Sequence, residues 1–138
     1  MKNAFVDTNI LVYAADESPG ESRKRTIARE LLRAAGLKIS VQVLNEFLAS
    51  ARSKHKLDLS PAAEKDWLSA WLAMEVEPLT SSHFLDALRI HHTYQLSHWD
   101  SLIVATALFS QADILYSEDM QHGQLIDGIR IINPFQEE

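Results

Sequence analysis

Short apolar runs alternate with longer amphipathic stretches along this sequence, and that alternation restricts the folds open to the chain. Five short segments have the composition of strands: 4–6, 37–39, 75–77, 113–116 and 129–132. The segments between them place apolar residues at helical spacing. Strands separated by helices need crossover connections, which are right-handed in nearly all proteins. We therefore expect an α/β fold, with a parallel sheet flanked by helices on both faces.

Helix boundaries are marked by residues that favour the first turn of a helix. Ser40 can cap one helix, Pro61 suits the first turn of another, and Ser97 can cap a third. The helix after Ser97 is apolar nearly all round from residue 102 to residue 109. A helix without a polar face is buried in the interior, so we expect this helix to be central.

The composition is that of an ordinary globular protein. The chain has 138 residues, of which 46% are hydrophobic and 23% are charged, so we expect residues 1–138 to form one domain. The N-terminal apolar run is interrupted at Asp7, and no apolar stretch approaches the ~20 residues that cross a bilayer. We therefore expect a cytoplasmic protein without membrane contact. The absence of cysteine excludes disulfides, thiolate metal sites and cysteine nucleophiles.

The net charge is −6, from 19 acidic and 13 basic residues, and this argues against a generally basic surface for nucleic acid. Two local basic segments exist nevertheless. One comprises residues 23–25 with Arg29 and Arg33, and the other comprises residues 52–56. Each segment can be a solvated helix face or a set of phosphate contacts.

Four carboxylates fall where a parallel sheet places its ligands, outside the carboxyl ends of the strands. Asp7 directly follows the first strand, and Asp119 comes just after the strand that ends at residue 116. Glu46 lies on the second turn of the helix that leaves the second strand. Asp100 lies in the first turn of the buried helix. Taken alone, Asp7 and Asp100 could be helix caps, Asp119 a turn residue and Glu46 a solvated helix residue, but together they predict one acidic site.

Such a site suits Mg²⁺ or Mn²⁺, because these hard cations prefer oxygen ligands and keep positions for water and phosphate. Bound there, the ion polarises a phosphoryl oxygen, activates water and stabilises the departing oxygen. Two carboxylates ~5 Å apart repel by roughly 3 kcal/mol at a dielectric constant near 20, so four of them call for a cation. The sequence has no phosphate-binding loop, nucleophile elbow or HExxH motif that indicates another chemistry.

Four motifs resemble those of the PIN-domain family and stand in the family's order. They are residues 5–11, FVDTNIL; 43–47, VLNEF; 98–107, HWDSLIVATA; and 115–120, LYSEDM. The resemblance implies a five-stranded parallel sheet in a three-layer sandwich and a Mg²⁺- or Mn²⁺-dependent endoribonuclease. The metal-binding and catalytic residues would be Asp7, Glu46, Asp100 and Asp119. The supporting polar residues would be Asn9 and Ser117, the latter where the family often has Thr.

Within that family, the short chain looks most like the VapC-type toxins of toxin–antitoxin pairs. This likeness implies an RNA substrate, a small antitoxin protein as partner and a homodimer. The alternative is a degenerate PIN-like module that binds RNA or protein without cutting. A dehalogenase-type phosphotransferase would need an acid two residues after Asp7, where Asn9 stands, and a receiver domain would need a lysine where Arg130 stands.

Overall fold

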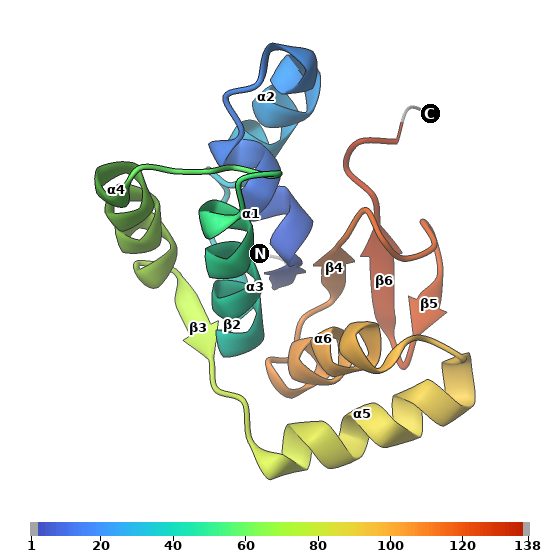
Figure 1. Cartoon of the computed structure of the whole chain (residues 1–138). Coiled ribbons are helices and arrows are strands. Elements are labelled where there is room, and N and C mark those ends of the chain that lie inside the picture. Colours follow the sequence, from blue (N-terminus) through green and yellow to red (C-terminus); the bar gives the residue numbers. More distant parts are fainter. Residues whose placement is uncertain (1–2, 137–138) are drawn as a thin grey trace.

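The central sheet of this computed structural model has the strand order β3-β2-β1-β4-β6-β5 (Figure 1). The structure describes residues 3–136, so the first two and last two residues of the expected domain lie outside it. The strands are β1 Ala4–Val6, β2 Leu37–Ser40, β3 Glu75–Glu77, β4 Ile114–Tyr116, β5 Leu125–Ile126 and β6 Ile129–Ile132. Neighbouring strands are parallel, except that β5 and β6 are antiparallel. The predicted α/β class is confirmed.

The expected number of five strands was wrong, because β5 adds a sixth strand that pairs antiparallel with β6. The turn between them is Asp127-Gly128, with φ values of 48° and 92°. An Asp-Gly pair with two positive φ angles is a preferred two-residue hairpin turn. This dipeptide was a signal of the hairpin in the sequence, whereas β5 itself is too short to show an alternating pattern.

Six α-helices and one 3₁₀ turn connect the strands within residues 3–136. They are α1 Thr8–Ala15, η1 Pro19–Glu21, α2 Ser22–Leu31, α3 Val41–Arg52, α4 Pro61–Leu72, α5 Ser81–Tyr94 and α6 His98–Phe109. The connections from β1 to β2 to β3 step one way across the sheet, and the connection from β3 to β4 steps back. With right-handed crossovers, α1–α4 therefore cover one face, while α5 and α6, which lie side by side, cover the other (Figure 1). No helix among the described residues is long and apolar enough to cross a membrane.

Side-chain caps fix where the helices begin relative to the strands. Ser40, the last residue of β2, accepts a hydrogen bond from the backbone N–H of Val43, and Ser97 accepts one from Asp100. Both caps were predicted from the sequence. Asp7 caps α1 directly after β1 by accepting from the Thr8 N–H. α1 and α3 thus begin directly after β1 and β2, at the carboxyl edge of the sheet. α3 carries Glu46 in its second turn, and α6 carries Asp100 in its first turn.

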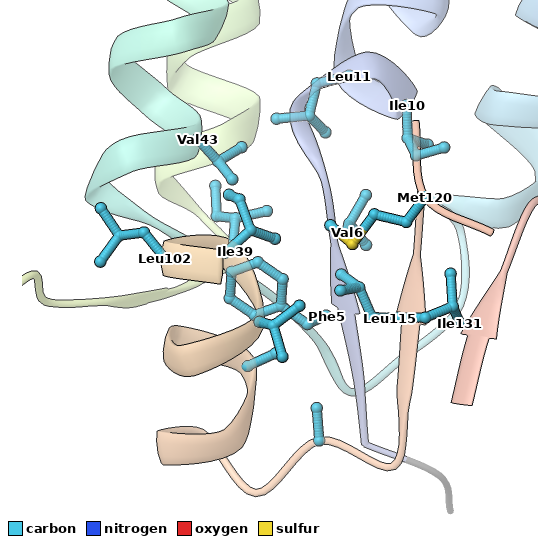
Figure 2. Packing of buried hydrophobic residues seen from close by; sticks show 14 of the residues in the cluster. Phe5, Val6, Ile10, Leu11, Ile39, Val43, Leu102, Leu115, Met120 and Ile131 are labelled. Atoms are coloured by element: carbon cyan, nitrogen blue, oxygen red, sulfur yellow. The ribbon is translucent and has the colours of Figure 1, made fainter. Parts of the chain in front are cut away.

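The hydrophobic core is centred on β1, which is buried along its whole length. Figure 2 shows Phe5 and Val6 of β1 among side chains from β4, α1, α3 and α6, including Leu115, Val43 and Leu102. In α6, every residue from 101 to 107 is buried, which confirms the predicted interior helix. The residues that follow the central strands are therefore positioned by a buried hydrophobic core.

We predict that Leu115→Ala lowers the free energy of unfolding by about 2–5 kcal/mol, because it leaves a cavity beside β1. Leu115 is fully buried, whereas Leu125 on β5 is 53% exposed and offers a matched control. Leu125→Ala is expected to change the stability by no more than about 0.5 kcal/mol. Urea unfolding of both variants measures the difference, and equal losses would contradict the central place given to β4.

Candidate active site

Asp7 occupies a buried position where β1 ends, and both of its carboxylate oxygens accept hydrogen bonds. Its Oδ1 accepts from the Thr8 N–H at 2.7 Å, and its Oδ2 accepts from the Ser117 hydroxyl at 2.8 Å. The β1–β4 register pairs Val6 with Tyr116, which places the next residues, Asp7 and Ser117, side by side. Ser117, predicted as a supporting polar residue, therefore contacts the most buried of the four acids.

Asp119 is held beside Asp7 by the two predicted supporting residues. The Asn9 amide donates to the Asp119 carboxylate at 3.0 Å, and the Asn9 carbonyl oxygen accepts from the Glu118 N–H at 3.3 Å. The Ser117 hydroxyl oxygen accepts from the Asp119 N–H at 3.2 Å. The Asp119 side chain is thus fixed to α1, and the Asp119 backbone is fixed to Ser117, which directly follows β4.

Glu46 reaches the same edge of the sheet from α3. Its Oε1 accepts from the Thr8 hydroxyl at 2.5 Å, and its Oε2 accepts from the Gln42 amide at 3.2 Å. The Gln42 amide also donates to the backbone carbonyl of Trp99 at 3.2 Å. Gln42 therefore ties Glu46 to the start of α6. Thr8 and Gln42 were not among the site residues predicted from the sequence, although Gln42 stands one helical turn before Glu46.

Asp100 lies in the first turn of α6, directly after Trp99, and is partly exposed. Burial raises its pKa above the ordinary value, and the negative charges of Asp119 and Glu46 raise it further. A hydrogen bond with the Ser97 side chain acts in the opposite direction. The position of Asp100 in the fold therefore brings it under the electrostatic influence of two of the other acids.

Burial also raises the pKa of Asp7, from 3.8 to about 7. Hydrogen bonds from Ser117 and Thr8 lower the value, while the charges of Asp119 and Glu46 raise it. The structure thus brings all four predicted acids into one electrostatically coupled group. Within residues 3–136, none of the four forms an ion pair with a basic side chain.

The four carboxylates do not converge on a single point. Among the described residues, no three Asp, Glu or His side chains stand close enough together to hold a metal ion as they are oriented. Glu46 and Asp119 instead point to their hydrogen-bond donors, Thr8 and Asn9. The donor atoms are nevertheless the carboxylate oxygens that a hard divalent cation prefers.

A pocket of about 540 Å³ opens beside Glu46 and Asp119. Its lining residues are Thr8, Asn9, Val12, Tyr13, Glu46, Ala49, Ser50, Lys56 and Asp119. Of the four predicted acids, Asp7 and Asp100 are not part of this lining. Lys56 is exposed and brings a positive charge from the loop after α3 to the rim of an otherwise acidic site.

The basic segment in α2 is largely engaged inside the protein. Arg25 donates to the backbone carbonyl of Asp16 and Arg29 to that of Ala14, both at 2.8 Å, near the end of α1. In the second segment, the Arg52 guanidinium donates to both carboxylate oxygens of Glu64. Lys56, by contrast, lines the acidic pocket, where its ammonium group is placed to contact a phosphate.

Comparison with known proteins gives one family and several similar folds. The family described as "PIN domain" matches residues 4–125. No curated protein matches the chain. A toxin–antitoxin complex from Klebsiella pneumoniae has a TM-score of 0.73 at 19% identity, covering 96% of this chain and 98% of that chain. VapC20 of Mycobacterium tuberculosis, described as a sarcin–ricin loop cleaving toxin, has a TM-score of 0.66 at 18% identity, covering 85% and 90%. VapBC2 of Rickettsia felis, bound to a promoter DNA fragment, has a TM-score of 0.63 at 19% identity, covering 93% and 96%.

We predict that Asp7→Asn stabilises the protein at pH 8 in EDTA, and that the gain disappears as the pH falls toward 4. The folded-state pKa of about 7 lies above the ordinary value of 3.8, so ionising Asp7 destabilises the fold as the pH rises between these values. The gain is at most roughly 4 kcal/mol, the equivalent of this shift in pKa. Asparagine keeps the capping acceptor for Thr8. Thermal unfolding across this pH range measures the effect.

Asp127→Asn provides a control of opposite sign. Hydrogen bonds from Tyr94 and Arg89 lower the pKa of Asp127, so its charge stabilises the fold above the unfolded-state pKa, and this is lost in acid. That variant should be less stable than the wild type at neutral pH, with the difference fading as the pH falls. A pH-independent effect of Asp7→Asn would contradict the burial argument.

Proposed function

The chain belongs to the PIN domain family, and on that premise we propose that it is a metal-dependent endoribonuclease, the toxin of a toxin–antitoxin pair. Residues 1–138 would form a single nuclease domain that acts in the cytoplasm. The observation that carries the proposal is the coupled group of four acids at the carboxyl edge of the sheet, in which Asp7 is fixed by Ser117 and Asp119 by Asn9. The similar toxin structures support the same reading.

We propose that Asp7, Glu46, Asp100 and Asp119 bind Mg²⁺ or Mn²⁺. PIN nucleases generally use divalent metal ions, and the oxygen donors present here suit them. The raised pKa of Asp7 supports the assignment, because a bound cation would offset the unfavourable burial of its charge. Since the side chains do not converge as they stand, metal binding would require Glu46 and Asp119 to reorient toward the ion.

A bound divalent ion would supply a polarised phosphoryl oxygen and an acidified water. The residues of this chain contribute orientation. Ser117 and the Thr8 N–H fix the two oxygens of Asp7, while Gln42 holds Glu46 to the start of α6. Such contacts matter because displacement of a reacting group by about 1 Å can reduce the rate by roughly 100-fold.

RNA is the proposed substrate, and proteins are the proposed partners. One similar structure is described as a toxin that cleaves the sarcin–ricin loop, and another is a toxin–antitoxin complex, which supports RNA cleavage and a small antitoxin here. A homodimer is the proposed assembly. The exposed apolar side chains of Phe84, Leu85 and Trp99 offer surface that a second copy could cover.

We predict that the purified protein cleaves RNA in Mg²⁺ or Mn²⁺ and that EDTA abolishes the cleavage. The products should carry 5′-phosphate and 3′-hydroxyl ends, because an activated water would attack the phosphorus, the bond to the 3′-oxygen would break, and that oxygen would leave and take up a proton. Asp7→Asn should lower kcat by on the order of 100-fold, since it changes the most fixed carboxylate. End-group analysis decides the mechanism: cyclic-phosphate products that persist in EDTA would count against the acidic site. Binding of RNA without any cleavage would favour the degenerate module.

We predict that Lys56→Ala weakens RNA binding similarly for different sequences. Losing one phosphate contact should reduce the slope of log affinity against log salt by about 0.7–1. Arg52→Ala is the matched control, because the Arg52 guanidinium is already bonded to Glu64. Affinity is measured over a range of salt concentrations, with Ca²⁺ present to suppress cleavage. An unchanged slope for Lys56→Ala, or an equal change for Arg52→Ala, would place the phosphate path elsewhere.

A further inference from the structure

The loop that carries Asp119 is also held in place through the side chain of Glu118, which contacts residues of α1 and α2. One carboxylate oxygen of Glu118 accepts from the Tyr13 hydroxyl at 2.7 Å, and the other is paired with the Lys24 ammonium. Lys24 also donates to the Tyr13 hydroxyl at 3.1 Å. These three residues come from the loop after β4, from α1 and from α2, so the cluster joins three separate parts of the fold.

Two aromatic rings partly enclose this ion pair. The Lys24 nitrogen lies 4.7 Å from the centre of the Tyr13 ring and 5.6 Å from that of Phe135. The two rings meet edge to face, with their centres 4.9 Å apart. The side chains of Lys24 and Glu118 are 31% and 24% exposed. A pair enclosed in this way is screened less by water and salt than a surface pair.

The same loop is held by Asn9 from the side of the acids. Asn9 accepts from the Glu118 N–H and donates to the Asp119 carboxylate. Asn9 and Tyr13 are four residues apart on α1, so they lie on one face of that helix. One face of α1 therefore binds the backbone of Glu118 through Asn9 and the side chain of Glu118 through Tyr13. Lys24, on α2, pairs with the same Glu118 carboxylate.

We propose that Glu118 and Lys24 are positioning residues for the proposed nuclease reaction, with Tyr13 as their shared hydrogen-bond partner. The pair fixes the loop so that Asp119 stays at a constant distance from the other three acids. This inference rests on the proposed function, and the pair acts through Asp119 without itself contacting the scissile phosphate. An ion pair with a merely structural role would stabilise the fold and leave turnover unchanged.

The chain contains a matched network for telling these roles apart. Asp127 accepts from the Tyr94 hydroxyl at 2.6 Å and pairs with Arg89 at 2.7 Å, and its side chain is 29% exposed. It lies in the turn before β6, at the opposite edge of the sheet from the acids. Asparagine tolerates the positive φ of that position. Asp127→Asn therefore breaks a similar carboxylate–tyrosine–cation cluster remote from Asp119.

The experiment compares Glu118→Gln, Lys24→Met and Asp127→Asn in the full chain. It measures melting temperature, kcat and KM for RNA cleavage in Mn²⁺, and backbone amide exchange at residues 118 and 119. We expect all three variants to lose stability. Glu118→Gln and Lys24→Met should also lower kcat by about tenfold with little change in KM, since a displaced carboxylate affects turnover more than binding. Amide exchange at both residues should accelerate in these two variants alone, and Lys24→Arg should retain the wild-type values.

Two results would overturn the inference. One is a fall in kcat that follows the melting temperature equally in all three variants, and the other is unchanged amide exchange at residues 118 and 119. Because Lys24→Met leaves the loop sequence intact, it decides the question if Glu118→Gln does not fold. Absence of any RNA cleavage by the wild type would instead overturn the proposed function, and the exchange measurement would then decide alone whether the pair fixes the loop.

Discussion

The parallel pairing of β1 with β4 is the contact on which the rest of the site depends. It places Asp7 beside Ser117 although the two residues are 110 positions apart, and the resulting hydrogen bond fixes one oxygen of a buried carboxylate. The strands themselves are dry and well packed, with Phe5 and Leu115 fully buried. At the ends of these buried apolar strands, the next residues, Asp7 and Ser117, are polar or charged. Because Asp7 directly follows the buried residue Val6, its carboxylate is well oriented, but its charge is unfavourably buried.

The distribution of charge follows from the same architecture. An acidic protein with a net charge of −6 has few cations to place, and several of them serve the fold. In α2, Arg25 and Arg29 bind carbonyl oxygens near the end of α1, where helix carbonyls lack partners within the helix. Lys24 holds the Asp119 loop. In the first basic segment, Lys24, Arg25 and Arg29 therefore stabilise contacts between neighbouring elements. Lys56 is the basic residue in the lining of the pocket, which also contains Glu46 and Asp119.

The sequence predicted which acids stand at the strand ends, because strand and helix starts are encoded locally by apolar runs and by caps such as Ser40 and Ser97. The resemblance of its motifs to the PIN family also indicated Asn9 and Ser117, which form hydrogen bonds with Asp119 and Asp7 in the structure. It did not reveal that Thr8 binds Glu46, or that Lys24 binds Glu118, because each pair is separated by many residues and meets only through tertiary packing. The short strand β5 was not predicted for a different reason: two residues carry no periodicity, and the Asp127-Gly128 dipeptide is the one local signal of the hairpin.

The order of the elements along the chain has a consequence for how the molecule comes into being on the ribosome. β1, at the centre of the sheet, is synthesised first. Its neighbour β4 is synthesised only after all six α-helices of the described residues. A nascent chain that ends before β4 carries Asp7, Glu46 and Asp100 without Ser117 or Asp119, and its β1 has one open edge. The acidic group is thus completed late in synthesis. A translation product that ends before β4 lacks Asp119 and cannot form the complete group of four acids.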